Sequence, residues 1–569
     1  MSCSDQAMME GGHTLTVPWW SFVALRPHIS AMVRSFGMKL GTDLQISAEA
    51  EALLKKSSRA AQSYTQASQA LVMSDQDVLG RLGRVSFARS LTTEQMRNVK
   101  RLAAVPAGAT FSVPGAGKTT EALATFFCRA ADDDRLLVIA PKNAFAAWDE
   151  QLESCAPTCK DHFVRLVNGQ ESIRQLLNGN PRFMLITYQQ LTRVRDLIAE
   201  TIAGAPTHVF LDESHRIKNG TGQASQIIQS ISHLPASKLV MSGTPMPQSH
   251  ADLLPQFSFL FPEITATEND VVSLMQPIYV RTTKTELCLP PVDRLVRKLE
   301  MSPLQDQLYR LMKSEVARDC SAFLTTRSKQ AFRYLGRSVA RLLQFVSNPS
   351  LLASEIGFAH GDLLGAVLAD GQGPKMRYVL KRARGLAREG NKVLIWSSFV
   401  RNVEYIAESL QDIGAVYIHG GVGIGDEEDD DSREGKIKRF HSDPNVMVMV
   451  ANPAAASEGI SLHRVCHHAI YLDRSFNAAH YLQSEDRIHR LGLSPDQHTT
   501  IEIVECINTV DETVQSRLNF KVRQMGQALA DPGLRIDPLP MDAMEAEDEL
   551  YTGGLEIDDV RSLLSDLER

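Results

Sequence analysis

Short apolar runs alternate with amphipathic stretches along most of this chain. Ten runs of four or five residues are almost continuously apolar, and they fall into two series. Such runs are typical of strands that helices cover on both faces, and strands alternating with helices predict parallel sheets. The expected strands lie at 109–113, 136–140, 183–187, 208–211 and 238–241, and then at 393–396, 415–418, 446–450, 469–472 and 500–504.

The segments outside the two series have different patterns. Residues 300–385 lose strand character, and their apolar positions recur every three or four residues, as in helices. The first 87 residues include the cluster Trp19, Trp20 and Phe22, which we expect to form a small core in an accessory domain. We therefore predict an N-terminal accessory domain (1–87), an α/β lobe (88–299), a helical insertion or linker (300–385), a second α/β lobe (386–529) and an acidic tail (530–569) that is mostly extended apart from a helix near 557–567.

Composition places the chain among globular proteins with several domains. It has 569 residues, of which 43% are hydrophobic and 22% charged. No apolar stretch is long enough to cross a membrane, and the first residues lack the pattern of a signal peptide. Eight scattered cysteines favour a reducing compartment, and Cys155, Cys159 and His162 are too few ligands for a zinc site. We expect an intracellular, cytoplasmic protein of bacterial or viral type, and a nuclear location stays open.

Charge is distributed unevenly along the chain. The net charge is −7, but residues 531–569 alone hold 12 acidic and 3 basic side chains, a balance of −9, which leaves +2 for the rest. Binding of nucleic acid depends on where Lys and Arg cluster rather than on the net charge. The overall charge therefore excludes neither nucleic acid nor protein partners.

A glycine-rich turn follows the first expected strand. The segment VPGAGKTT at 113–120 leads directly into a helical pattern, so that backbone N–H groups and a helix N-terminus can face phosphates. Gly115 and Gly117 permit the turn, Lys118 supplies a charge for the outer phosphates, and Thr119 offers a hydroxyl to Mg²⁺. The usual pattern for such a loop has Gly where this chain has Ser112.

Two adjacent carboxylates end the fourth expected strand. Asp212 and Glu213 would lie at the carboxyl edge of the sheet, where α/β proteins bind ligands. Asp212 can hold a metal ion through water, and Glu213 can orient and deprotonate an attacking water molecule. A helix cap after a strand is the plainer alternative, but the glycine-rich turn upstream favours catalysis.

A pair of arginines follows the fourth strand of the second series. On a helix over 483–490, Arg487 and Arg490 would share one face, and such a pair can stabilise charge on a transferred phosphoryl group. Taken alone, the same spacing is more common in a solvated, ion-paired helix.

In chain order, these and further segments resemble the superfamily 2 helicase-like ATPases, and specifically the Swi/Snf-like branch of double-stranded DNA translocases. The resemblance covers about residues 88–525. The matching segments are 91–95 for the adenine-reading Gln element, 114–119 for motif I, 140–148 for motif Ia, 187–188 for motif Ib, 212–219 for motif II, 241–246 for motif III, 392–399 for motif IV, 457–462 for motif V and 483–490 for motif VI.

Three features favour the Swi/Snf-like branch, and three short segments depart from it. The favourable features are RIKN at 216–219, RTTK at 281–284 and RIHRLG at 487–492. Ser214 stands where the family usually has Gly or Ala, Ala451–Asn452 replaces a Ser-Thr pair, and Ser457–Glu458 replaces a Gly-rich start of motif V.

The resemblance implies two RecA-like lobes that close on ATP and Mg²⁺. It implies catalytic roles for Lys118, Asp212, Glu213, Arg487 and Arg490, metal binding by Thr119 and Asp212, and nucleotide binding by Gln95, Gly115, Ala116, Gly117, Lys118, Thr119, Thr120 and Gly459. Lys142, Thr187 and Ser397 are the candidates for contacts with the DNA backbone. Contacts of this kind predict little sequence specificity and a strong dependence on salt.

The expected function is a DNA-stimulated ATPase that translocates on double-stranded DNA. An RNA or single-strand helicase of the same superfamily is an alternative, and so is a nucleotide-gated scaffold within a multi-protein repair or defence complex. Protein partners would bind through the N-terminal domain or the acidic tail. The biological process and the oligomeric state stay open.

Overall fold

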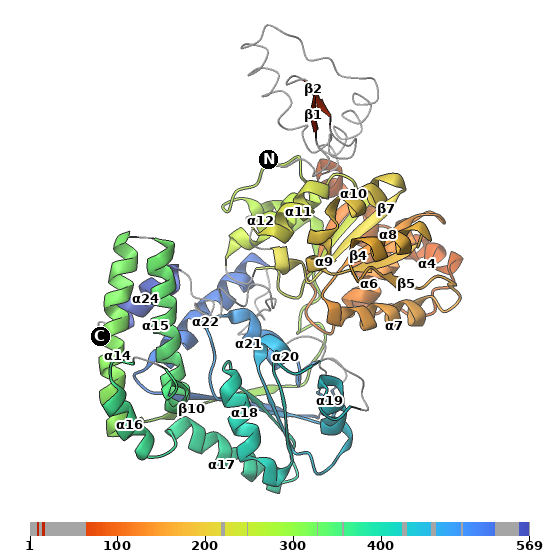
Figure 1. Cartoon of the computed structure of the whole chain (residues 1–569). Helices are drawn as coiled ribbons and strands as arrows, with labels where there is room; N and C mark the ends of the chain where they lie inside the picture. The colour runs from red at the N-terminus through yellow and green to blue at the C-terminus, as the bar shows by residue number, and fades with distance from the viewer. Residues whose placement is uncertain are drawn as a thin grey trace. The chain divides into compact units, whose positions relative to one another are not determined.

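The chain divides into two compact units, Met1–Glu286 and Leu287–Arg569, each built around one parallel sheet (Figure 1). The computed structural model describes residues 8–10, 14–16, 64–217, 222–246, 249–326, 328–355, 358–423, 429–456, 462–490, 493–494, 496–529 and 557–567. Within these ranges, no helix combines the length and the apolar character needed to cross a bilayer.

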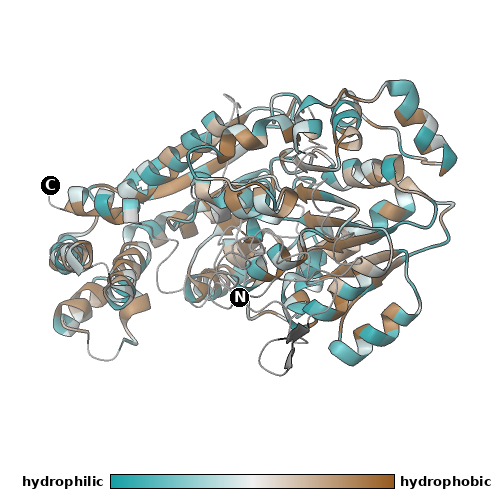
Figure 2. Ribbon diagram, turned by 90° about the horizontal axis from the view of Figure 1, so that it is seen from above, coloured by the Kyte–Doolittle hydropathy of each residue, from teal (hydrophilic) through white to brown (hydrophobic). Residues whose placement is uncertain are grey.

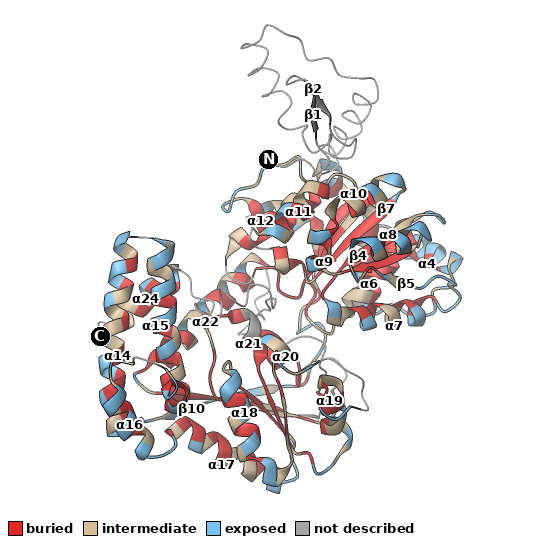
Figure 3. Cartoon of the chain, in the orientation of Figure 1, coloured by how far each residue is buried: buried red, intermediate tan, exposed pale blue. Residues whose placement is uncertain are grey.

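The first unit contains a seven-stranded sheet with the order β5-β6-β4-β7-β8-β3-β9, and all its pairings are parallel. Its central strands are buried on both faces (Figure 3). The strands are β3 (Ala107–Thr110), β4 (Arg135–Ile139), β5 (Phe163–Arg165), β6 (Phe183–Ile186), β7 (Thr207–Asp212), β8 (Ser237–Met241) and β9 (Tyr279–Val280). The helices are α5 (Thr93–Ala104), α6 (Lys118–Arg129), α7 (Phe145–Cys155), α8 (Gln170–Asn178), α9 (Tyr188–Arg193), α10 (Arg195–Gly204), α11 (Gln223–Ile231), α12 (Leu253–Leu260) and α13 (Val271–Met275).

All five strands expected in this unit are present, with ends shifted by at most three residues. The apolar residues of these runs are buried, which is why their composition identified them. Two edge strands, β5 and β9, were not predicted. They have three and two residues, which is too short for a recognisable pattern.

Residues 64–87, expected as part of an accessory domain, pack instead on the first unit. Helix α4 (Asp75–Arg84) places Val78 and Leu82 in the same apolar core as α5 and α6. The hydroxyl of Tyr64 donates to Leu274 O at 2.8 Å. Further upstream, β1 (Met8–Glu10) and β2 (Thr14–Thr16) form an antiparallel pair. The cluster Trp19, Trp20 and Phe22 lies outside the described residues.

The second unit contains a six-stranded parallel sheet with the order β10-β15-β14-β11-β13-β12. The strands are β10 (Val292–Leu299), β11 (Val393–Trp396), β12 (Ala415–Ile418), β13 (Val448–Ala451), β14 (His468–Tyr471) and β15 (Thr499–Cys506). The helices around the sheet are α17 (Pro374–Arg388), α18 (Val400–Ser409), α19 (Arg433–Ser442), α20 (Pro453–Ala456), α21 (Ala478–Glu485) and α22 (Val510–Ala528). All five strands expected in this lobe are present.

Strand β10 corrects the expected end of the first lobe at residue 299. Its eight residues pair in register with β15, from Val292 opposite Thr499 to Leu299 opposite Cys506. The strand lies at the sheet edge, is half-exposed and carries four charged side chains, so it lacks the apolar run of a central strand. The first compact unit therefore ends near Glu286.

The segment after β10 is helical, as predicted. It forms α14 (Pro303–Thr326), α15 (Lys329–Ser347) and α16 (Gly361–Ala369), which share an apolar core with α22. Both hydrophilic and hydrophobic residues occur along the helical ribbons of the chain (Figure 2). The predicted tail helix is α24 (Ile557–Leu567), and it packs against α14 and α22.

Candidate active site

The glycine-rich turn joins β3 to α6 in the first unit. Gly115 and Gly117 have φ angles of 84° and 82°, in the left-handed region that favours glycine. A Cβ at position 117 would lie 2.3 Å from Nε2 of Gln95, so a larger side chain cannot be accommodated there without a shift. The backbone conformation and the close approach of Gln95 therefore both favour glycine at position 117.

Lys118 is the first residue of α6, and its side chain folds back over the turn. Its Nζ donates to Ser112 O at 3.0 Å and to Val113 O at 3.4 Å. The ammonium group, the left-handed turn and the N-terminus of a 12-residue helix thus meet at one place. This donor set is the one that binds the phosphates of a nucleotide in this kind of loop.

Gln95 contacts the turn directly. Its Nε2 donates to Ala116 O at 3.0 Å, and its Oε1 accepts from the Thr92 N–H in a capping box that begins α5. The side chain is buried, with 6% of its surface exposed. The structure therefore brings the predicted Gln element and the phosphate loop together, while recognition of adenine stays a prediction.

Thr119 and Thr120 follow Lys118 and have different surroundings. Thr119 is half-buried, whereas Thr120 is buried and its hydroxyl donates to Gln151 Oε1 at 2.9 Å. The location of the Thr120 hydroxyl therefore gives no support to a nucleotide contact through that group.

A buried polar cluster, which the sequence did not reveal, lies next to the glycine-rich turn. Asn98 Nδ2 lies within hydrogen-bond distance of Glu121 Oε1 at 2.8 Å, Thr282 Oγ1 at 2.9 Å and Ser112 Oγ at 3.3 Å. Thr110 donates to the other oxygen of Glu121 at 2.9 Å. Burial raises the pKa of Glu121, although the hydrogen bonds from Asn98 and Thr110 oppose that rise. Ser112, the departure from the usual Gly, thus has a defined place in this cluster.

Asp212 is the last residue of β7, and donors engage both of its carboxylate oxygens. Trp148 Nε1 donates to Oδ2 at 2.9 Å, and the Glu213 N–H donates to Oδ1 at 2.9 Å. Tyr188 donates to the backbone oxygen of Asp212 at 2.8 Å. Burial raises the pKa of Asp212, while the Trp148 hydrogen bond and the charge of Lys118 oppose that rise. Asp212 ends β7, and the turn follows β3; both strands pair with β8, which lies between them in the sheet.

Glu213 has a φ angle of 49°, which is unusual for a residue with a side chain. Its Oε2 lies 3.5 Å from Nδ1 of His215, and the same nitrogen lies 3.0 Å from Ser242 Oγ. Strained backbone of this kind persists only where the surroundings hold it. The segment after β8 provides part of that support, and a Cβ at Gly243 would lie 2.8 Å from Pro114 of the turn.

These residues gather at one edge of the first sheet. The turn follows β3 and the carboxylates end β7, and both strands flank β8. Carboxyl ends of parallel strands form the usual ligand site of α/β proteins. Carboxylate and hydroxyl oxygens suit Mg²⁺, so Asp212 and Thr119 fit a site for magnesium and nucleotide phosphates.

The candidates for DNA contacts in the first unit lie at the same sheet edge. Lys142 follows β4 and is exposed as the first residue of a short 3₁₀ turn. Thr187 follows β6, and its hydroxyl accepts from the Gln190 N–H at 3.0 Å as the N-cap of α9. Their roles stay predictions.

Ser397, the third candidate, is completely buried in the second unit. Its hydroxyl donates to Asp473 Oδ2 at 2.6 Å, and Ser347 donates to the same oxygen at 2.6 Å. The Ser398 N–H donates to Asp473 Oδ1 at 2.6 Å. This position gives no support to a direct phosphate contact by the Ser397 hydroxyl.

The predicted helix over 483–490 is shorter than expected, because α21 ends at Glu485. Tertiary contacts hold the following residues in a turn. The Leu462 N–H donates to Arg487 O at 2.9 Å, Ile488 is buried, and His489 Nε2 lies 2.7 Å from Pro290 O.

Arg487 and Arg490 therefore do not lie on one helix face. Arg487 is largely buried and its Nε donates to Gln483 O at 2.9 Å, while burial lowers the pKa of Arg490. Gly459, predicted to contact nucleotide, lies outside the described residues.

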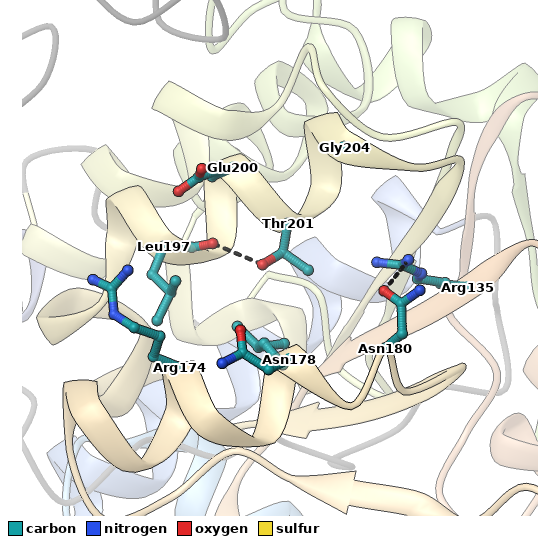
Figure 4. Close-up of a pocket in the computed structure, with 9 residues that line it drawn as sticks. Arg135, Arg174, Asn178, Asn180, Leu197, Glu200, Thr201 and Gly204 are labelled. Atoms are coloured by element: carbon teal, nitrogen blue, oxygen red, sulfur yellow. Dashed lines mark hydrogen bonds between the residues drawn. The ribbon is translucent and has the colours of Figure 1, made fainter.

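A separate groove of about 320 Å³ opens between α8 and α10 (Figure 4). Arg135 and Asn180, two of its lining residues, are joined by a hydrogen bond of 2.5 Å. Arg135 begins β4, so this groove lies at the amino edge of the sheet and away from the turn. It does not belong to the candidate active site.

Comparison with known proteins agrees with the two-unit organisation. Residues 97–271 match the model of the SNF2-related domain, and residues 375–492 match that of the helicase conserved C-terminal domain. The chromodomain-helicase-DNA-binding protein 1-like of Mus musculus is 24% identical over 446 residues, which are 72% of this chain and 46% of that protein. Nuclear protein STH1/NPS1 of Saccharomyces cerevisiae is 22% identical over 465 residues, 73% of this chain and 33% of that protein.

This chain therefore spans less than half the length of these two relatives. Among solved structures, the SWI2/SNF2 ATPase core of Sulfolobus solfataricus in complex with double-stranded DNA is 17% identical. The alignment covers 84% of this chain and 97% of that one, with a TM-score of 0.34.

Proposed function

Because this chain belongs to the Swi/Snf-like branch of the superfamily 2 ATPases, we propose that it is a DNA-stimulated ATPase that translocates on double-stranded DNA. The observation that supports the proposal is that the turn with Lys118 and the segment with Asp212 and Glu213 both lie at the carboxyl edge of the first sheet. A phosphate-binding turn beside two carboxylates is the arrangement that nucleotide hydrolysis requires.

Each of these residues has a distinct part in the proposed hydrolysis. Lys118 and the backbone N–H groups of the turn would bind the outer phosphates, and Asp212 would hold the metal ion. Bound Mg²⁺ supplies charge neutralisation on the phosphate oxygens. Glu213 orients the attacking water molecule and accepts its proton at a carboxylate oxygen. The hydrogen bond from Trp148 keeps the Asp212 carboxylate in one orientation, so the same carboxylate geometry is present in each catalytic cycle.

Arg487 and Arg490 are proposed to stabilise the charge on the transferred phosphoryl group. This role rests on the motif in which they lie, and both belong to the matched C-terminal domain. Arginine suits it because its guanidinium group keeps its charge and can bind two phosphate oxygens at once. Replacement of either residue by Ala should lower kcat more than it changes the affinity for ATP.

Double-stranded DNA is the proposed stimulating ligand. The name of the Mus musculus relative reported above records DNA binding. Lys142 and Thr187 lie at the ends of neighbouring strands and are the proposed phosphate contacts in the first unit. Movement along the duplex would follow from cycles of ATP binding and hydrolysis.

Steady-state ATP hydrolysis with different nucleic acids tests the proposal. We expect duplex DNA to raise kcat of the full chain, and Lys118→Ala and Glu213→Gln to abolish the stimulated rate. Stimulation by RNA alone or by single-stranded DNA alone would contradict the choice of duplex DNA. A triplex-displacement assay then tests translocation separately from hydrolysis, because a stimulated ATPase that never displaces the third strand does not translocate.

A further inference from the structure

The residue that follows Glu213 is hydrogen bonded to a glutamine far along the chain. Ser214 is completely buried, and its Oγ donates to Gln256 Oε1 at 2.8 Å. Ser214 begins the short turn after Glu213, whereas Gln256 lies in the middle of α12. Gln256 therefore supplies the acceptor for the buried Ser214 hydroxyl.

The amide nitrogen of Gln256 is hydrogen bonded to the segment after β8. Its Nε2 donates to Pro245 O at 2.7 Å and to Asp252 O at 3.0 Å. Both of these acceptors are carbonyl oxygens, so only the amide nitrogen can face them. The orientation of the amide is therefore determined, and Oε1 must face the Ser214 hydroxyl.

Gln256 has no exposed surface, and its neighbours on α12 include the buried Phe257 and Phe259. A buried amide is unfavourable unless all of its polar atoms are paired, and here every one is. Such a fully paired group holds its partners in one arrangement, because any displacement leaves a polar atom unsatisfied. Gln256 therefore links Ser214 to Pro245 rigidly.

This link holds the two segments that surround Glu213. Ser214 is bonded covalently to Glu213, whose φ angle of 49° needs support from its surroundings. Pro245 lies three residues after Ser242, which contacts His215 at 3.0 Å. The strained residue is thus held on one side by the contact between His215 and Ser242, and on the other by the chain Ser214–Gln256–Pro245.

We propose that Gln256 is a positioning residue for Glu213 through its hydrogen bond to Ser214, an inference that rests on the proposed ATP hydrolysis. Gln256 does not touch the reacting atoms. It keeps the carboxylate where it can orient water, so its loss lowers the rate of the chemical step and leaves ATP binding by the glycine-rich turn intact.

Kinetics of Gln256→Met test this inference, because Met has a similar volume and no polar atoms. We expect kcat of the full chain to fall about tenfold, since small displacements of catalytic groups have large effects on rate, while KM for ATP stays within about twofold. Gln229→Met is the matched control. Gln229 Nε2 also donates to a backbone oxygen of α12, Pro255 O at 2.8 Å, but no hydrogen bond among the described residues joins its side chain to Ser214 or Glu213. The control should leave kcat unchanged.

Two further variants separate positioning from general stability. The first test is a double-mutant cycle made of Ser214→Ala, Gln256→Met and the variant with both changes. Because both changes break the same hydrogen bond, kcat of the double variant should be no lower than kcat of Gln256→Met alone. Gln256→Glu should recover kcat only at acidic pH, where a protonated carboxyl group can again donate to Pro245 O. Neither result is expected of a residue that only supports the fold.

The possible failures can be told apart. A Gln256→Met variant with lowered thermal stability and wild-type kcat overturns the positioning role and leaves the proposed function standing. The same holds if kcat falls no more than in Gln229→Met, or if the two single effects simply add in the double variant. A wild-type chain that hydrolyses ATP no faster than Lys118→Ala overturns the proposed function and this inference together.

Discussion

The indole Nε1 of Trp148 donates to Asp212 Oδ2 at 2.9 Å, and this bond joins α7 to the end of β7. Trp148 is completely buried against the same apolar core as β4 and β6. Because packing fixes the position of the Trp148 indole, its hydrogen bond also fixes the orientation of the Asp212 carboxylate. A partner that orients a metal-binding carboxylate in this way usually affects metal affinity or activity strongly when it is removed.

We predict that Trp148→Phe weakens the apparent affinity of the ATPase for Mg²⁺. Without the donor, Asp212 is less well oriented, and the Mg²⁺ concentration for half-maximal rate should rise about tenfold. A titration of the rate with Mg²⁺ measures this shift. The matched control is Trp396→Phe, since Trp396 is equally buried but its indole N–H has no acceptor among the residues that the structure describes. An unchanged Mg²⁺ titration for Trp148→Phe would show that the bond has no role in metal binding.

The tail helix should depend on one buried carboxylate. Asp559 of α24 has no exposed surface and accepts from Arg517 Nε at 2.6 Å and from Lys521 Nζ at 2.8 Å. Removing one member of a buried ion group leaves its partners without compensation, at a cost of about 3–5 kcal/mol. We predict that Asp559→Asn lowers the free energy of unfolding of the second unit by about 3 kcal/mol, or releases α24 from α14 and α22.

Denaturant unfolding and hydrogen exchange distinguish these two results, because release of α24 raises exchange on that helix and on α14 without global unfolding. Asp558→Asn is the control, since its ion pair with Arg561 is well exposed. The control should change the stability by less than about 0.5 kcal/mol. Equal effects of the two variants would contradict the importance of the buried group.

The second unit should lose stability as the pH falls. Burial, and then the charges of Arg490 and Arg464, lower the pKa of His463 to about 4. In the unfolded chain the ordinary pKa of histidine is about 6.5. The unfolded state therefore binds more protons between these values, so stability that is present above pH 6.5 decreases toward pH 4.

We predict that His463→Asn reduces this loss of stability. Urea unfolding of wild type and variant at pH 7 and pH 5 gives the comparison, and the difference between the two pH values should be smaller in the variant. If both proteins lose the same free energy of unfolding, other groups are responsible for the pH dependence.

Lys142 should contribute to duplex binding through charge alone. It is exposed at the carboxyl edge of the first sheet. We predict that Lys142→Ala weakens stimulation by duplex DNA equally for different sequences, and that it reduces the slope of log affinity against log salt by about one. Lys160→Ala, an exposed lysine in the segment that enters β5, is the control and should leave both unchanged. A sequence-dependent effect of Lys142→Ala would contradict a contact with the backbone.

Much of the fold could be predicted from local patterns. The central strands of both sheets are short apolar runs, and they were recognised because burial on both faces demands such composition. Strand β10 was not recognised from the sequence, because it carries Arg294, Arg297 and Lys298 and so lacks an apolar run. As an edge strand it can still pair with β15 while these side chains form ion pairs. The turn after Glu485 was missed because contacts of Ile488 and His489 with distant segments outweigh the local tendency to continue a helix.

The candidate site divides in the same way between local and distant information. The glycine-rich turn with Lys118, and the carboxylates after β7, are continuous in the sequence, so their residue types and spacing alone identified them. Gln256 gave only a weak signal, as one polar residue within the apolar helix LLPQFSFL. Nothing local indicated that it would reach Ser214, 42 residues earlier.

By itself, the sequence determined which segments become buried strands and where the chain turns at Gly115 and Gly117, and it indicated the side chains for which we propose roles in nucleotide chemistry. Only the tertiary structure decided that Trp148 holds Asp212, that Asn98 and Glu121 support the turn, and that Asp559 joins the tail helix to α22. The physical reason is that backbone conformation and burial follow from neighbouring residues, whereas a hydrogen-bond partner depends on which distant segments pack together.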